Sequence, residues 1–388
     1  MYVHRQHVAY EDQLRRKTEL ATSIFQDCGT QDELDSWLRP TIPSPQLYNY
    51  RNKVSPHYTL GKGMEPVSIG FNSFPFTSSL PLSEDIRDGT GVECFSKTID
   101  DNFQQQGVVD VKKCVIATEA INKAYEKMRE TVSEKAKRQT RGATLVFRDS
   151  GSGDICNNHK DRLVMRTSIG PGGKAVNFLI EGNSFFQTNS VVLPRMLEYV
   201  VKEIGGPSEI DFVMDLYCGV GVFAYAAIMS GYRHVLGLEI SKTAIAMALQ
   251  AKNLNDLPDI EVREVSKHIG MNRFTKENHG KRLLQFKDLE ADNITKDSYV
   301  TAVLRQHSPN RTCVIIDPPR KGCSSTFLEQ LLSLAPRRIV YVSCYMPTQA
   351  RDVKILRNGG YNIAAIQPVD QYPQTHHVEN IVTLVKDL

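Results

Sequence analysis

Two side chains near the end of the chain can do covalent chemistry. Cys344 follows the apolar run 339–343, and Glu379 follows His376 and His377. A cysteine thiolate is a strong nucleophile, and a carboxylate can accept a proton during a reaction. We therefore predict that Cys344 is a nucleophile and that Glu379 is a base, which the two histidines could tune or orient. The alternatives are a small core cysteine and a solvated carboxylate.

A glycine motif predicts a nucleotide site. Gly219 and Gly221 lie between the apolar run 212–216 and an expected helix at 223–229. Glycines allow a tight turn and a close approach to a ligand. Glu239 closes the next apolar run, where an acidic side chain can reach ribose hydroxyls. G-x-G serves a pyrophosphate poorly, so we predict S-adenosyl-L-methionine; the alternative is an ordinary turn with a solvated carboxylate.

A second loop is stiffened by two prolines. Asp317 ends the apolar run 313–317 and is followed by Pro318 and Pro319. Ligands of open α/β sheets bind outside the carboxyl ends of the strands. The prolines restrict the loop and remove two backbone donors, so the loop can hold Asp317 toward a base in a pocket. The alternative is a rigid loop with a helix-capping aspartate.

Together these motifs suit methylation at C5 of a uracil. That carbon is too weakly nucleophilic to take a methyl group directly. Addition of the Cys344 thiolate to C6 makes C5 an enolate carbon, and Glu379 can then remove the C5 proton so that the thiol is eliminated. Because each motif ends or follows an apolar run, the side chains are expected to face one crevice.

The second half of the chain predicts a doubly wound, Rossmann-like α/β sheet. Apolar runs of strand length alternate with helix-length segments and lie at 212–216, 235–239, 260–262, 313–317, 339–343, 361–367 and 381–385. Unbroken apolar strands imply a sheet that is covered on both faces. We expect the polar and charged stretch 266–306 to be a surface insertion.

The first half predicts an α+β domain built on an antiparallel sheet. Residues 1–38 are expected to be helical. A further helix and short strands are expected at 117–136 and at 58–60, 67–71, 108–111, 143–148, 163–167 and 175–180. We divide the chain into a central, RNA-binding domain at 1–184, which includes a helical segment at 1–45, and a methyltransferase domain at 185–388.

Composition limits the classes of protein. The 388 residues are 41% apolar and 23% charged, with a net charge of +3, so any case for nucleic acid must be local. The cysteines show no C-x-x-C spacing, so we expect no metal. No apolar run reaches the roughly 20 residues of a membrane span. We expect a cytoplasmic or nuclear protein; acidic residues near the N-terminus argue only weakly against a mitochondrial one.

Local features suggest contacts with RNA. A basic stretch contains Lys127, Arg129, Lys135, Lys137, Arg138, Arg141 and Arg148. This excess of positive charge could follow a phosphate backbone or could be a solvated helix end. A base must leave its stack to reach Cys344, so aromatic side chains are expected near the pocket. The candidates are Phe185, Phe186 and Tyr345.

The second half resembles the RNA uracil-5-methyltransferase family. The similar segments are 185–189, 217–219, Glu239, 317–320, Cys344, 370–373 and 376–379. Segments 50–53, 114–118 and 141–145 resemble eukaryotic, particularly fungal-type, transfer-RNA members.

The resemblance implies that Cys344 is the nucleophile and Glu379 the base. It places Gln187, Tyr217, Glu239 and Asp317 around S-adenosyl-L-methionine, together with the glycines of the motif. The expected substrate is transfer RNA, at the T-loop uridine, and we expect a monomer. The alternatives are a ribosomal-RNA uracil-C5 methyltransferase and a catalytically degenerate protein that binds or folds transfer RNA.

The sequence also departs from the family pattern. Tyr345 follows the nucleophile where the family usually has asparagine, and Val220 and Val222 stand where polar or small residues are common. We expect no oligonucleotide-binding barrel before Tyr48. The cysteine cluster of iron–sulfur members is absent.

Overall fold

The computed structural model describes residues 5–60, 66–72, 108–136, 142–170, 172–265 and 281–386. The helices are α1 Tyr10–Phe25, α2 Gln31–Trp37, α3 Glu119–Ala136, α4 Leu193–Ile204, α5 Val222–Met229, α6 Lys242–Ala251, α7 Ser298–Leu304, α8 Ser325–Leu334 and α9 Met346–Asn358. Short 3-10 turns are η1 Gln26–Cys28, η2 Lys252–Leu254, η4 Ala291–Asn293 and η5 Pro309–Arg311. None of these described helices is long and apolar enough to cross a bilayer.

Within the described residues, the strands form one large sheet and three small ones. The small sheets contain β1 Lys53–Val54, β2 His57–Leu60, β3 Pro66–Asn72, β4 Val108–Asp110, β5 Ala143–Thr144, β6 Phe147–Asp149, β7 Ile155–Cys156, β8 Arg162–Ser168 and β9 Ala175–Glu181. The large sheet contains β10 Phe212–Leu216, β11 His234–Glu239, β12 Ile260–Glu264, β13 Arg282–Asp288, β14 Thr312–Ile316, β15 Arg338–Ser343, β16 Tyr361–Val369 and β17 Glu379–Lys386.

The large sheet confirms the predicted doubly wound architecture. Its strand order is β12-β13-β11-β10-β14-β15-β17-β16, and its strands are parallel except for β17, which is antiparallel to both β15 and β16. Every residue of β14 is buried, because its side chains alternate between two cores. Cys313 and Ile315 enter one core, and Val314 and Ile316 enter the other. The unbroken apolar strands are therefore covered on both faces.

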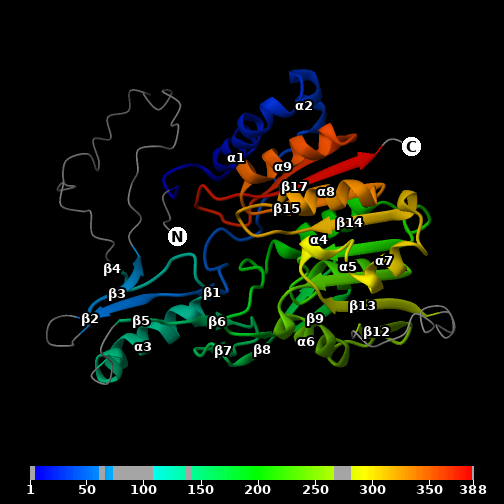
Figure 1. Cartoon of the computed structure of the whole chain (residues 1–388). Helices are drawn as coiled ribbons and strands as arrows, with labels where there is room; N and C mark the ends of the chain where they lie inside the picture. The colour runs from blue at the N-terminus through cyan, green and yellow to red at the C-terminus, as the bar shows by residue number, and fades with distance from the viewer. Residues whose placement is uncertain are drawn as a thin grey trace.

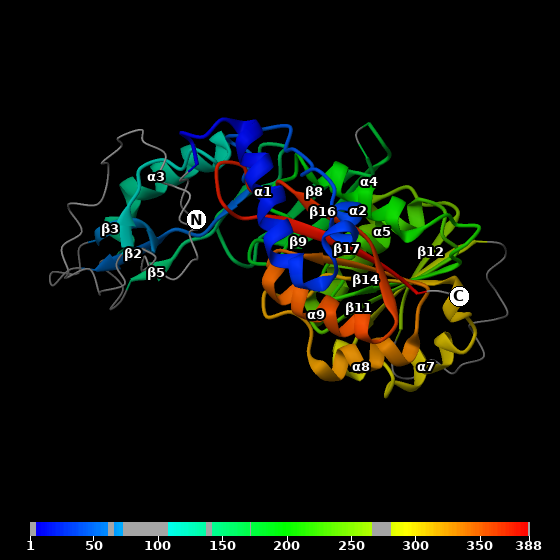
Figure 2. The ribbon, with the colours of Figure 1, turned by 90° about the horizontal axis from the view of Figure 1, so that it is seen from above.

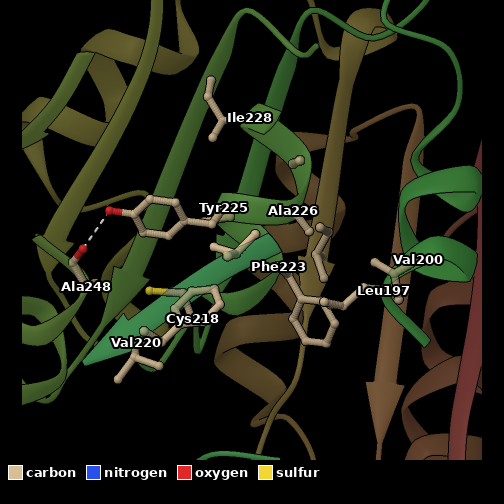
Figure 3. Close-up of a cluster of buried hydrophobic side chains, with 14 of the residues drawn as sticks. Leu197, Val200, Cys218, Val220, Phe223, Tyr225, Ala226, Ile228 and Ala248 are labelled. Carbon is tan, nitrogen blue, oxygen red and sulfur yellow. Dashed lines mark hydrogen bonds between the residues drawn. The ribbon is translucent and has the colours of Figure 1, made fainter. Parts of the chain in front are cut away.

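Helices α4, α5 and α6 cover one face of this sheet, and the β8–β9 hairpin packs against α4 and α6 in the same core. Figure 3 shows part of that core, where Phe223 points toward Leu197 of α4. In the same core Tyr225 Oη donates a 2.8 Å hydrogen bond to the carbonyl oxygen of Ala248. Helices α1, α7, α8 and α9 cover the other face. The predicted helix–strand alternation thus places helices on both sides.

The stretch 266–306, predicted to be a surface insertion, contains an interior strand of the large sheet. β13 lies between β12 and β11, and its side chains Leu283, Leu284 and Phe286 are buried. The expectation for 266–306 was therefore wrong for β13, and also for α7, whose apolar side chains enter the core. Residues 266–280 lie outside the described part of the chain.

Polar residues that interrupt β13 explain this error. Gln285 and Lys287 break the apolar run, but both are buried in the sheet. Gln285 Nε2 donates to Tyr299 Oη at 2.6 Å, and Lys287 Nζ lies 3.4 Å from Asp297 Oδ2. Partners supplied by the following helix and its cap remove the cost of burying these groups, and the local sequence does not reveal such partners.

The first half contains the predicted antiparallel sheet. Its strand order is β4-β3-β2-β5, and α3 packs against it through Tyr125, whose Oη donates to the carbonyl oxygens of Ile69 and Val111. Figures 1 and 2 show this sheet and α3 to one side of the large sheet. The strand predicted at 143–148 is divided between two sheets, as β5 and β6.

The N-terminal helices pack beside the last strands of the chain. α1 contacts α9 and β16, and Figure 2 shows it running along this part of the large sheet. The following segment continues along the sheet edge: Arg39 N donates to Ile366 O, and Ile42 N donates to Pro368 O, each at 2.9 Å. The N-terminal helices and the segment after them therefore pack against the C-terminal part of the large sheet. The division of the chain at residue 185 stays a prediction.

Candidate active site

The turn between β10 and α5 requires its two glycines for different reasons. Both have positive φ, 56° at Gly219 and 84° at Gly221. A Cβ on Gly221 would lie 2.6 Å from Phe286 Cζ of β13, so this glycine allows helix and sheet to pack closely. A Cβ on Gly219 would meet nothing within 4 Å, so this position faces open space. Tyr217 also has positive φ, 62°, which is uncommon for a bulky residue and often marks a functional turn.

A pocket opens beside this turn, at the carboxyl end of β10. Its lining residues are Phe185, Phe186, Gln187, Tyr217, Cys218, Gly219, Val220, Val222, Phe223 and Asp317. Four predicted cofactor residues, Gln187, Tyr217, Gly219 and Asp317, are therefore brought together. Gly221 and Glu239 lie outside the lining.

Glu239 nevertheless borders the pocket. Its Oε2 accepts a 3.1 Å hydrogen bond from Gly219 N, and its Oε1 accepts a 2.8 Å bond from Ser241 N. These bonds fix the carboxylate at the end of β11, beside the open side of Gly219. Because a carboxylate has about four acceptor sites, Glu239 can still accept hydroxyl donors from a ligand.

Asp215 is a further acidic group that the sequence reading did not select. It is fully buried in β10, where its Oδ2 accepts a 2.8 Å hydrogen bond from Ala224 N at the start of α5. Its Oδ1 has no hydrogen-bond partner among the described residues. Burial raises the pKa of Asp215 well above its usual range, and the nearby Asp317 and Glu239 add to the rise. Its signal was an acidic residue inside the apolar run 212–216.

The pocket thus concentrates carboxylates around an open backbone turn. Asp317 and Glu239 lie close enough to Asp215 to add to the rise in its pKa, so a cationic ligand would relieve the repulsion that Asp215 experiences. S-adenosyl-L-methionine carries a positive sulfonium and an ammonium group beside two ribose hydroxyls. The donor set fits this cofactor, with Glu239 placed for the hydroxyls and Gln187 and Asp317 available to its polar groups.

The antiparallel pairing of β15 and β17 brings Cys344 and Glu379 together. Ser343 of β15 pairs with Asn380 of β17, so Cys344 and Glu379 occupy the next position along the two antiparallel strands. Of the seven cysteines among the described residues, only Cys114 and Cys344 are not buried. The alternative of a small core residue therefore fits the other cysteines better than it fits Cys344.

Burial and nearby charged groups, among them Arg320, shift the pKa values of Cys344 and Glu379. Burial, and then the Glu379 carboxylate, raises the pKa of the Cys344 thiol to about 11, whereas Arg320 lowers it. Burial likewise raises the pKa of Glu379 well above its usual range; Asp317 adds to that rise, and Arg320 opposes it. Arg320 is therefore a further site residue, and its signal was its place directly after the Asp-Pro-Pro motif.

His377, two residues before Glu379, is held as a neutral ring. Burial, and then the neighbouring His376, lowers the pKa of His377 to about 3. The two ring centroids lie 4.1 Å apart, and the His377 ring lies edge-on to Tyr372. A neutral imidazole can help to orient Glu379 but adds no positive charge to the site.

Helix α9 fixes the strands and loops that carry these groups. Gln349, one turn into α9, accepts a 2.8 Å hydrogen bond from Asn380 Nδ2 and donates a 2.7 Å bond to Tyr341 O. Thr348 Oγ1 donates to the carbonyl oxygen of Arg320 at 3.0 Å. The helix that follows Cys344 therefore ties together β15, β17 and the Arg320 loop.

Two of the three predicted stacking residues are exposed. Phe185 is 69% exposed at the rim of the pocket, and Tyr345 is 45% exposed beside Cys344. Phe186 packs in the core, 5.9 Å from Phe178 between ring centroids, so it is a poor candidate for stacking on a base. The rim thus offers Phe185 and Tyr345.

The predicted basic stretch does not form one exposed track. Arg148 is fully buried in β6, and Arg129 Nη2 forms a 2.9 Å ion pair with Asp110 Oδ1. Lys127 is exposed on α3. The described structure covers neither residues 137–141 nor the side chain of Lys135. Arg148 was wrongly included, because the packing around β6 buries all three of its residues, Arg148 among them.

The described residues contain no group of three or more histidine, cysteine, aspartate or glutamate side chains arranged to hold a metal ion.

A profile of the tRNA (Uracil-5-)-methyltransferase family matches residues 101–387, which is most of the chain. The chain belongs to this family. It is 31% identical to the tRNA (uracil(54)-C(5))-methyltransferase of Schizosaccharomyces pombe and 26% identical to that of Saccharomyces cerevisiae. The alignments cover 98% and 96% of this chain, but only 63% and 59% of those relatives, so the chain spans about three fifths of their length.

A solved structure supports the same fold. The Pyrococcus abyssi tRNA (uracil-54, C5)-methyltransferase, in complex with S-adenosyl-L-homocysteine, matches 98% of this chain and 84% of its own, with a TM-score of 0.61. At 22% sequence identity, this likeness concerns the fold.

Proposed function

We propose that the chain transfers a methyl group from S-adenosyl-L-methionine to C5 of a uridine in transfer RNA. The T-loop position named for its relatives, uracil 54, is the proposed target. One observation carries the proposal: the register of β15 and β17 sets a partly exposed thiol beside a buried carboxylate. The acidic pocket lies at the same sheet edge: its lining residue Asp317 is close enough to raise the pKa of both Cys344 and Glu379.

The proposed reaction uses the thiol first. Arg320 favours the thiolate of Cys344, whose sulfur forms a bond to C6 of the uracil. The electron pair of the C5–C6 double bond moves toward O4, so that C5 becomes nucleophilic. Bound S-adenosyl-L-methionine would supply a methyl group on a positively charged sulfur. As C5 forms its bond to that methyl carbon, the methyl–sulfur bond breaks, its electron pair stays on the sulfur, and S-adenosyl-L-homocysteine is the leaving group.

The proposed role of Glu379 is to complete the reaction. Its carboxylate accepts the C5 proton, the C6–sulfur bond breaks with its electrons returning to Cys344, and the C5–C6 double bond is restored. Burial raises the pKa of Glu379, so its carboxylate form binds a proton more strongly than the carboxylate of an exposed glutamate does. Around this centre Phe185 and Tyr345 offer rings on which neighbouring bases can stack.

Transfer of a labelled methyl group tests this function directly. The chain is incubated with labelled S-adenosyl-L-methionine and a transfer-RNA transcript, and the RNA is digested to nucleosides. We expect labelled 5-methyluridine, and none from a transcript with cytidine in place of the T-loop uridine. Label only in a ribosomal-RNA fragment would favour the ribosomal alternative. Transfer-RNA binding without label, and without a covalent adduct on 5-fluorouridine RNA, would favour a binding protein.

A further inference from the structure

Helix α1 buries a stripe that is polar at one end and apolar at the other. Gln13, Lys17, Ala21 and Phe25 recur every fourth residue, so they lie on one helix face, and all four are buried. Ala21 and Phe25 enter the core shared with α9 and β16. The apolar end is sufficient to dock the helix, whereas burying an amine and an amide is costly unless both are paired. The polar end therefore serves another contact.

That contact is with the loop that leads to Glu379, residues 370–378 between β16 and β17. Lys17 Nζ forms an ion pair with Asp370 Oδ1, and both side chains are fully inaccessible to solvent. Lys17 Nζ also donates to the carbonyl oxygen of Tyr372 at 3.1 Å. Tyr10, on the first turn of α1, donates from its hydroxyl to Asp370 Oδ2 at 2.9 Å. One helix thus satisfies both oxygens of a buried carboxylate in the loop.

A second pair of side chains fixes the middle of this loop. Gln13 Nε2 donates to Gln374 Oε1 at 3.0 Å, and Gln13 Oε1 accepts from Gln374 N at 3.1 Å. Gln374 has a φ of 66°, a left-handed conformation that is unfavourable for a residue with a side chain. Such a conformation persists only where surrounding contacts impose it, and α1 supplies these contacts.

The loop also reaches the cofactor pocket. Gln371 Nε2 donates to Oε1 of the pocket residue Gln187 at 3.0 Å. At its far end the loop runs into Glu379, at the start of β17. The segment held by α1 therefore contacts a residue of the cofactor pocket and positions the candidate base.

We propose that Lys17 and Gln13 are positioning residues for methyl transfer, acting through loop 370–378 to hold Glu379 beside Cys344. This inference rests on the proposed function. A buried ion pair adds little to stability compared with apolar packing, but its partners must meet in one geometry. Lys17 selects the loop conformation through Asp370, and Gln13 selects it through Gln374.

Paired substitutions separate positioning from folding. The double variant Lys17→Met with Asp370→Asn removes both charges, so no unpaired charge stays buried. Gln13→Leu tests the second contact independently. Arg15→Met is the matched control, because Arg15 lies on the exposed face of α1, with 59% of its side chain accessible. For each variant we would measure thermal unfolding, S-adenosyl-L-homocysteine affinity, turnover on transfer RNA, and hydrogen exchange of loop 370–378.

The proposal predicts a step-specific defect. In the double variant and in Gln13→Leu, turnover should fall about 100-fold, because displacing a reacting group by about 1 Å costs on that order. A methylated covalent adduct should accumulate, because elimination needs Glu379 in place. Loop 370–378 should exchange about tenfold faster, while cofactor affinity stays near that of Arg15→Met.

Other outcomes overturn the inference. Turnover and loop exchange equal to those of Arg15→Met would show that α1 only packs against the loop. Parallel losses of cofactor affinity, unfolding temperature and turnover would show a general role in folding. If the wild-type chain neither methylates RNA nor forms an adduct, the proposed function fails. Unchanged loop exchange in the double variant would then reject any positioning of the loop by α1. Faster exchange confined to the loop would show that α1 holds the loop, but it would still reject a role in methyl transfer.

Discussion

The cofactor pocket and the catalytic pair are assembled in different ways. Much of the pocket lining comes from one turn–helix segment, 217–223, which supplies the open glycine and the bulky turn residue. The buried Asp215 carboxylate stands just before this segment and accepts a hydrogen bond from Ala224 N. The pair of Cys344 and Glu379 depends on an antiparallel register and on a loop that Lys17, more than 350 residues earlier in sequence, helps to hold. A local motif can therefore build a pocket, whereas placing a nucleophile against a base needs the whole fold.

This difference predicts that substitutions in the two regions will have separable effects. Changes in the pocket should weaken cofactor binding and leave addition of the thiol to RNA intact. Changes in the catalytic pair should alter the covalent steps and leave cofactor binding intact. Variants that fail to separate in this way would show that the two regions work as one unit.

The largest effect is expected from Cys344→Ala. Without the thiol no bond to C6 can form, so methylation should fall by at least about 10⁴-fold, while cofactor affinity and folding are retained. RNA that contains 5-fluorouridine should trap the wild-type chain as a complex stable on denaturing gels. Cys114→Ala is the matched control, since Cys114 is the other described cysteine that is not buried. An undiminished adduct with Cys344→Ala would reject Cys344 as the nucleophile.

The next largest effect is expected from Glu379→Gln. The amide keeps the size of the side chain but cannot accept the C5 proton, so turnover should fall about 10²–10⁴-fold. Addition and methyl transfer should still occur, and a methylated covalent enzyme–RNA complex should accumulate and release slowly. Mass spectrometry of the trapped complex would detect the methyl group. Normal turnover without an adduct would move the base to His376 or His377.

The sequence predicted those parts of the fold that repeat a simple local pattern. The runs at 212–216 and 313–317 correspond to the buried parallel strands β10 and β14, because apolar residues dominate both runs. β13 escaped detection because its two buried polar side chains find partners only in the folded chain. The same reason hid Lys17, since a lysine in a charged helix predicts exposure unless its distant carboxylate is known.

The site shows the same limit. Four of six predicted cofactor residues line one pocket, because the turn and the strand ends are adjacent in any doubly wound sheet. That Cys344 and Glu379 face each other depends on the reversal of β17, which spacing alone does not give. Arg148 shows the converse error, because a charge in sequence says nothing of how deeply its strand lies.

A smaller effect, confined to the pocket, is expected from Glu239→Ala. A carboxylate that accepts ribose hydroxyls contributes roughly 1.5–3 kcal/mol per bond, so cofactor affinity should fall about tenfold or more. Affinity for transfer RNA should change little. Glu264→Ala is the matched control, because Glu264 is an exposed glutamate at the end of the nearby strand β12. Calorimetry that finds equal cofactor affinity in both variants would contradict the assignment.

The smallest effect is expected from Arg320→Gln, and it concerns the charge of the thiol. Arg320 lowers the pKa of Cys344, so its removal should raise that pKa further above about 11 and reduce the thiolate fraction at any given pH below it. Because Arg320 is exposed, the interaction contributes only about 0.2–1 kcal/mol, which corresponds to alkylation slower by a factor of roughly 1.4 to 5 at pH 8.

This shift would be measured by alkylating the protein with iodoacetamide from pH 7 to 10 and quantifying the Cys344 peptide by mass spectrometry. Lys321→Gln is the control, because Lys321 is the exposed cation next in sequence. The rate should rise with pH in every variant, with the Arg320→Gln curve displaced toward higher pH. Coincident curves for the two variants would show that proximity to Arg320 does not favour the thiolate. The Arg320→Gln substitution should leave the affinity for S-adenosyl-L-homocysteine unchanged. Arg320 follows the pocket residue Asp317 in sequence, but its charge affects the pKa values of Cys344 and Glu379.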